Sequence, residues 1–146
     1  REGSGGHFHN MIIDSFAIEA LDTRDEVRSL VAMDKLTFSH NLISNNGRLG
    51  NLATEPEADD DDFGFQEDVW IQDPTNRNHQ LAESGLQPTV TSTTSPNFRS
   101  RGLIRNMEAT RPPKSEFFDE SADYLGAINP RSSDTWLDGW TAFPES

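Results

Sequence analysis

The chain has 146 residues, which is enough for one domain with one core. Its 25 acidic and 12 basic side chains give a net charge of -13. Such a charge repels nucleic acids and anionic membrane surfaces, so neither is expected as a partner. The absence of cysteine excludes disulfides and thiolate zinc sites, and no apolar run is long enough to predict a membrane span. With 33% hydrophobic residues and a mean hydropathy of -0.70, much of the chain is expected to be exposed turn and loop.

Residues 1–50 predict short strands interrupted by one helix. The apolar runs after the Gly-rich start have strand length and carry no long helical stripe. Residues 23–34 are the exception, because Val27 and Leu30 share one helical face. Thr23 and Glu26 have the spacing of a capping box, which predicts where this helix begins.

Two tetrads repeat 31 positions apart, His-Asn-Met-Ile at 9–12 and His-Asn-Leu-Ile at 40–43. Repetition of an apolar strand beside an Asn, closed by the Asn46-Gly47 turn, is typical of a right-handed parallel β-helix, in which Asn side chains stack at the bends. The spacing exceeds that of a minimal coil, and the helical insertion at 23–34 accounts for the excess.

The remaining chain divides by composition into three segments. Residues 51–71 predict an acidic loop followed by an apolar strand. Residues 72–115 are rich in Pro, Ser and Thr, and a structureless segment of this length is expected to lie as a strap along a solenoid that is already built. Residues 116–146 gather aromatic side chains that are expected to cover the open end of the solenoid as a C-terminal cap.

Four parts of the chain together resemble the C-terminal part of secreted bacterial right-handed parallel β-helix repeat proteins. They are the Gly-rich start, the coil at 36–47, the strap at 72–115 and the aromatic segment at 116–146. The closing signature is the specific part of this resemblance, and its matching positions are Phe117, Phe118, Asp119, Tyr124, Gly126, Ala127, Trp136, Gly139, Trp140 and Thr141. The resemblance implies an all-β fold made of the last coils of a parallel β-helix, with the helical insertion, the strap and the aromatic cap. It also implies a secreted or cell-surface location, but no reaction.

Family members carry a longer N-terminal portion, so the open N-terminal edge is expected to need a cover. We expect either the upstream part of the chain's own precursor or a neighbouring identical subunit to provide it, and head-to-tail stacking would give a filament. The competing interpretation of the aromatic close is a platform that stacks on sugars, which would make polysaccharide a partner.

A candidate metal site lies in the acidic run Asp59, Asp60, Asp61 and Asp62, whose oxygen atoms suit Ca²⁺. The EF-hand pattern is not met, because Phe63 occupies the fifth position. The alternative is a solvated acidic loop. Three histidines, His7, His9 and His40, are expected on one face, either as zinc or copper ligands or as a surface ladder.

No catalytic motif is present and no catalytic residue is assigned. Some β-helix proteins are polysaccharide lyases that use Ca²⁺ and a basic residue; the cations near the predicted coils are Arg24, Arg28, Lys35 and Arg48. The sequence therefore predicts a structural or adhesive component of the bacterial surface or extracellular matrix. A carbohydrate-active protein and a calcium-dependent extracellular module are the two alternatives.

Overall fold

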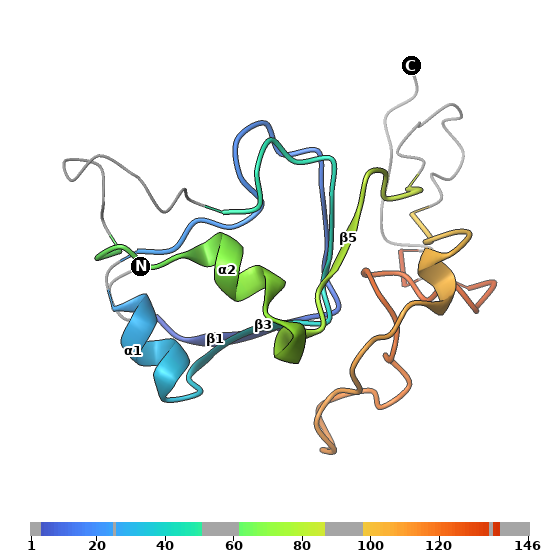
Figure 1. Cartoon of the computed structure of the whole chain (residues 1–146). Helices are drawn as coiled ribbons and strands as arrows, with labels where there is room; N and C mark the ends of the chain where they lie inside the picture. The colour runs from blue at the N-terminus through green and yellow to red at the C-terminus, as the bar shows by residue number, and fades with distance from the viewer. Residues whose placement is uncertain (1–3, 25, 51–61, 87–97, 135, 138–146) are drawn as a thin grey trace. The chain divides into compact units, whose positions relative to one another are not determined.

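The computed structural model describes residues 4–24, 26–50, 62–86, 98–134 and 136–137 (Figure 1). The chain forms two compact units, residues 1–84 and 85–146. The described strands and both α-helices lie in the first unit. They are β1 (Gly6–His9), β2 (Ile12–Asp14), α1 (Val27–Ala32), β3 (Leu36–Ser39), β4 (Leu42–Ser44), α2 (Glu67–Gln72) and β5 (His79–Leu81), with the 3₁₀ helix η1 (Pro74–Asn76) before β5.

The strands of the first unit form two small parallel sheets. One pairs β1 with β3, and the other has the order β2-β4-β5. Phe8 lies opposite Phe38 and Ile13 opposite Ile43, so the register joins positions 30 residues apart. We call residues 6–22 the first segment and residues 36–50 the second segment. Figure 1 shows the two running side by side along the same path.

Asparagine side chains brace the second segment against the first. The Asn41 amide nitrogen donates to the Phe8 carbonyl oxygen at 3.2 Å, and its oxygen accepts from the Met11 backbone N–H at 2.9 Å. Asn46 makes the same pair of bonds one bend later, to the Ile13 oxygen (3.1 Å) and the Phe16 N–H (2.8 Å). The backbone polar groups at both bends are thereby satisfied across the two segments.

The bracing is repeated where β5 joins the second segment. Asn78 donates to the Phe38 oxygen at 3.0 Å and accepts from the Asn41 N–H at 3.0 Å. The residue before each braced position is left-handed: Asn10 has φ 58°, His40 has φ 55° and Arg77 has φ 51°. Asn10 and His40 directly follow β1 and β3, whereas Arg77 follows η1, and each left-handed residue turns the chain.

The core of the first unit lies between the sheets and α2. It consists of Ile13, Phe38, Ile43 and Ile71, with Ala20, Leu21, Leu49 and Trp70 packed against it. Burying each large apolar side chain contributes about 1.5–3 kcal/mol, so α2 is held on the sheets chiefly by Ile71 and Trp70.

The predicted all-β fold made of the last coils of a right-handed parallel β-helix is wrong. Across the described ranges, the strands are three or four residues long and form two separate sheets, none closed and none a solenoid, beside two α-helices. The left-handed residue after β1 and β3 interrupts pairing, which limits strand length. The predicted apolar strand near residue 70 is α2, because Glu67, Trp70 and Ile71 have helical spacing.

Two local predictions also need correction. Helix α1 lies inside residues 23–34, but its N-cap is Glu26, which makes no capping bond, and Thr23 bonds elsewhere. The predicted strap at 72–115 is not one structureless segment, since it contains η1, β5 and the 3₁₀ helix η2 (Ile104–Asn106) and crosses the boundary between the two units.

The second unit consists of turns and η2 in its described part, and Ile104, Leu125 and Ile128 are buried there. The predicted burial of the aromatic cap is wrong for Phe117, Phe118 and Trp136, which are exposed. The indole nitrogen of Trp136 donates to the Ala127 oxygen at 2.8 Å, so its position is set by a hydrogen bond rather than by burial. The cap positions Gly139, Trp140 and Thr141 lie outside the described residues.

Candidate functional site

The first segment leaves large apolar side chains exposed. Phe8 is 44% exposed, whereas Phe38, its register partner in the second segment, is only 2% exposed. Three further apolar side chains of the first segment are also exposed: Met11 (39%), Phe16 (58%) and Ile18 (65%). The second segment is covered by the first segment on one side and by β5 on the other, while the first segment has only one described neighbour.

The amide bracing ends at the first segment. Met11 and Phe16 occupy the positions that Asn41 and Asn46 occupy in the second segment, 30 residues later. The side chains of Met11 and Phe16 carry no amide group that could form such hydrogen bonds to a preceding segment. An apolar surface therefore replaces the polar one at this end of the repeat.

The charged groups beside this apolar surface are compensated within the unit. Asp14 accepts hydrogen bonds from the hydroxyls of Ser44 and Ser84, both at 2.7 Å. Glu19 forms an ion pair with Arg48 at 2.8 Å. The charge of Glu19 is thus balanced by Arg48, whereas the hydroxyl partners of Asp14 are neutral.

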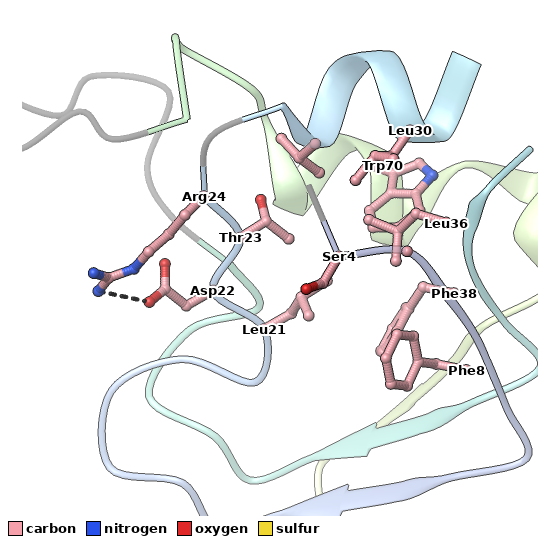
Figure 2. Close-up of a pocket in the computed structure, with 12 residues that line it drawn as sticks. Ser4, Phe8, Leu21, Asp22, Thr23, Arg24, Leu30, Leu36, Phe38 and Trp70 are labelled. Atoms are coloured by element: carbon pink, nitrogen blue, oxygen red, sulfur yellow. Dashed lines mark hydrogen bonds and ion pairs between the residues drawn. The ribbon is translucent and has the colours of Figure 1, made fainter. Parts of the chain in front are cut away.

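A cavity of about 350 Å³ lies beneath the start of the first segment. Figure 2 shows Phe8, Phe38 and Trp70 gathered on one side of it, together with Leu30 of α1 and Leu36 of β3. The rings of Phe38 and Trp70 lie 6.1 Å apart, and Phe65 meets the edge of Trp70 at 5.5 Å. The walls are therefore fixed by aromatic packing.

The opposite side of the cavity is polar. Asp22 and Arg24 form an ion pair there at 3.4 Å, drawn as a dashed line in Figure 2. Thr23 lies between them in sequence and also lines the cavity. A cavity with aromatic walls and a few polar groups is the usual form of a small-ligand site.

Thr23 connects the cavity wall to a buried carboxyl group on α2. The Oε1 atom of Glu67 accepts from the Thr23 hydroxyl at 2.5 Å and from the Thr23 N–H at 3.2 Å. Glu67 has no exposed surface. Gly50 makes room for it, because a Cβ at Gly50 would lie 2.4 Å from the Glu67 Cβ.

The pKa of Glu67 is raised to about 7. Burial is the main cause, since it penalises the charged form, and the neighbouring Asp62 carboxyl adds to the rise. The hydrogen bonds from Thr23 oppose it. Glu67 therefore changes its charge near neutral pH, which an ordinary Glu does not.

Asp62 is held at the start of the loop that leads into α2. It is 2% exposed, and its Oδ1 accepts from the Phe65 N–H at 2.9 Å. Phe63 and Gly64 are both left-handed, with φ 60° and 69°. Arg28 of α1 donates to the carbonyl oxygens of Phe63 (3.4 Å) and Gly64 (3.1 Å), which fixes the loop against α1.

The candidate metal residues Asp59, Asp60 and Asp61 lie outside the described residues. Asp62 is described, and it is buried rather than part of a solvated loop. No group of three or more His, Asp or Glu side chains that could hold a metal occurs among the residues that the structure describes.

The histidines form a network with hydroxyl groups. His7 Nδ1 is 2.9 Å from the Thr37 hydroxyl and His9 Nδ1 is 2.8 Å from the Ser39 hydroxyl. His40 Nδ1 contacts the same Ser39 oxygen at 3.1 Å. The imidazoles therefore bind neighbouring side chains instead of converging on one metal position.

Three of the four cations considered for a lyase, which were Arg24, Arg28, Lys35 and Arg48, make structural contacts. Arg24 pairs with Asp22, Arg28 binds loop carbonyls, and Arg48 pairs with Glu19. Glu67 was not among the predicted site residues. The signal that could have found it is an acidic residue at a helical position of the apolar run between Phe65 and Ile71.

Within the described part of the chain, no helix has the length and apolar character that crossing a bilayer requires. Comparisons of the chain with protein-family models, with curated proteins and with solved structures gave no match. The resemblance to secreted β-helix repeat proteins, and the location that it implies, therefore stay predictions from the sequence.

Proposed function

We propose that this chain is a structural component that assembles with further copies of itself, of the kind used at a cell surface or in an extracellular matrix. The observation that carries the proposal is the exposure of Phe8, Met11, Phe16 and Ile18 on the outermost segment. Large apolar side chains that gather on the exposed side of an outermost segment are typical of a protein–protein contact.

The backbone of the first segment supports the same conclusion. In the described sheets, β1 pairs only with β3, and β2 pairs only with β4. The outer edges of β1 and β2 therefore offer backbone groups to a further strand. A parallel sheet has two unlike edges, here β2 and β5, so pairing of one edge with the other in the next copy would extend without closing.

The distribution of charge determines where a second copy would meet the least repulsion. At a net charge of -13, two copies repel each other over most of their surface. The first segment is the exception, because Glu19 is paired with Arg48 and Asp22 with Arg24. A contact between copies meets the least repulsion there.

Sedimentation velocity over a wide range of protein concentrations tests the proposal. We expect the average mass to rise with concentration and to rise further in high salt, which screens the repulsion between acidic copies. A discrete dimer would indicate a symmetric contact, and a growing series would indicate head-to-tail stacking. A monomer at every concentration and salt level would rule out self-assembly.

The cavity favours one second candidate function, the binding of a neutral sugar. Phe8 presents a half-exposed ring across the cavity from the Asp22–Arg24 pair, and sugar rings combine an apolar face with hydroxyl groups that such a pair can bind. Calorimetric titration with neutral oligosaccharides tests this. Saturable heat that is lost in Phe8→Ala would support it, and the absence of heat at millimolar sugar would exclude it.

A further inference from the structure

The cavity beneath the start of the first segment changes from polar to apolar with depth. The side chains of Asp22 and Arg24 are 36% and 49% exposed, whereas Val27 is only 1% and Phe38 only 2% exposed. All four residues line the same cavity. The exposed pair therefore marks its mouth, and the buried residues mark its floor.

The floor of the cavity is built from apolar side chains. Apart from the indole nitrogen of Trp70, the side chains that line it carry only carbon atoms: Val27, Leu30, Leu36, Phe38 and Trp70. Thr23 also lines the cavity, but its hydroxyl and its backbone N–H both donate to Glu67. A ligand group that reaches the floor is therefore stabilised by leaving water, and a hydroxyl group there would lose hydrogen bonds.

The mouth of the cavity suits an uncharged group that carries hydroxyls. A hydroxyl can donate to the Asp22 carboxylate and accept from the Arg24 guanidinium, so a neutral polyol can use both members of the pair. An anionic group would also be repelled by the net charge of -13. Figure 2 shows the half-exposed ring of Phe8 on the other side of the cavity from this pair.

The size of the cavity limits what can enter it. Its volume of about 350 Å³ is near the lower end of the range for small-ligand pockets, which is roughly 300–1,000 Å³. A single ring or a short chain can be enclosed, and any larger part of the ligand must stay at the mouth.

We propose that the cavity binds neutral glycosides by their apolar aglycone. The aglycone, a short alkyl chain or one aryl ring, lies on the floor between Leu30, Leu36 and Trp70. The sugar stays at the mouth, against Phe8 and the Asp22–Arg24 pair. This inference rests on the sugar binding proposed above and names the class of sugar derivative that the cavity selects.

Calorimetric titration of the full chain with methyl, propyl and hexyl β-D-glucoside tests the inference. Affinity should rise about 4-fold for each added methylene until the floor is filled, so that the hexyl compound binds about 50-fold more tightly than the methyl compound. Equal affinity for the two would overturn the inference and leave sugar binding intact. No heat with any glucoside at millimolar concentration would remove both. 1-Hexanol, which lacks the sugar, should bind at least 10-fold more weakly than hexyl glucoside, and equal binding would also remove both.

Leu30→Phe locates the alkyl chain, because the larger ring occupies the floor. This variant should lose most of the gain with chain length and should bind methyl glucoside as the parent chain does. Met33→Phe is the matched control: Met33 directly follows α1, is 54% exposed and does not line the cavity, so the whole series should bind as to the parent chain.

Near-ultraviolet circular dichroism confirms that each variant is folded. Leu36→Phe fills the same floor from β3 and decides the question if Leu30→Phe does not fold. A folded variant of either kind that kept the full gain with chain length would overturn the inference, because the alkyl chain would then lie outside the cavity.

Discussion

The side-chain nitrogen of Asn41 donates a hydrogen bond to the main-chain oxygen of Phe8 at 3.2 Å, across 33 residues of chain. Asn41 is fully buried, and its side-chain oxygen accepts a hydrogen bond from the backbone N–H of Met11. One side chain therefore satisfies both polar groups of a bend in another segment. This relationship fixes the register of the first segment on the second more firmly than the short strands can by themselves.

Replacing Asn41 with Ala should lower the free energy of unfolding by about 2–3 kcal/mol, because it leaves the Phe8 oxygen and the Met11 N–H without their partner. Urea unfolding monitored by circular dichroism measures this loss. The matched control is Gln80→Ala, which truncates an exposed amide on β5 and should change stability by less than about 0.5 kcal/mol. Equal losses of unfolding free energy in the two variants would show that the hydrogen bonds of Asn41 do not stabilise the fold.

The repeat was visible in the sequence, but its register was not. The matching tetrads at 9–12 and 40–43 align His9 with His40, whereas the structure places His9 opposite Ser39. The bend requires a left-handed residue, and Asn10, His40 and Arg77 all serve. The backbone conformation repeats while the residue type varies. Aligning identical residues therefore predicted a repeat of 31 residues, one longer than the 30-residue register of the structure.

The candidate site was predictable only in part. An acidic run suggested a cation, and Asp62 belongs to that run. The burial of Asp62 and its proximity to Glu67 depend on the left-handed turn at Phe63 and Gly64 and on the space above Gly50. The turn is local but uses a left-handed Phe63, which the residue type does not predict, and the contact with Gly50 is distant in sequence. Composition and spacing could therefore not reveal the pair.

The stability of the protein should fall as the pH rises from about 4.5 to about 7. Glu67 keeps its proton in the folded state across this window, whereas the unfolded chain releases it near its ordinary value of 4.5. The stabilising contribution is complete below that value and is lost as the pH passes the folded-state value. It amounts to roughly 3 kcal/mol. Urea unfolding at a series of pH values measures the slope.

Glu67→Gln should remove this slope, because its amide does not titrate. Glu83→Gln should keep it, since Glu83 is exposed and lies outside the buried pair. If Glu67→Gln and the parent lost stability in parallel between pH 4.5 and 7, another group would have to carry the effect.

Gly47→Ala should be more destabilising than Gly6→Ala. A Cβ at Gly47 would lie 2.4 Å from the Ala17 oxygen and 2.6 Å from the Ile18 oxygen, so backbone atoms would have to move. A Cβ at Gly6 meets only ring atoms of Phe8, at 3.0 Å, and that half-exposed side chain can turn away. We expect a loss of about 1–3 kcal/mol at Gly47 and less than about 1 kcal/mol at Gly6, measured by urea unfolding. Similar losses of stability in the two variants would contradict the expectation that the backbone contact at Gly47 is the tighter one.

Phe16→Glu should weaken self-association at least 10-fold while leaving the monomer as stable as before. Phe16 is 58% exposed, so truncation removes little buried surface within one copy. In an assembly the new carboxylate would be desolvated at the contact and would add to the repulsion between two acidic chains. Val69→Glu is the control: Val69 is 57% exposed, belongs to α2 rather than to the first segment, and receives the same charge. Sedimentation velocity of both variants beside the parent separates a specific contact from a general effect of charge, because a general effect would weaken association equally in the two.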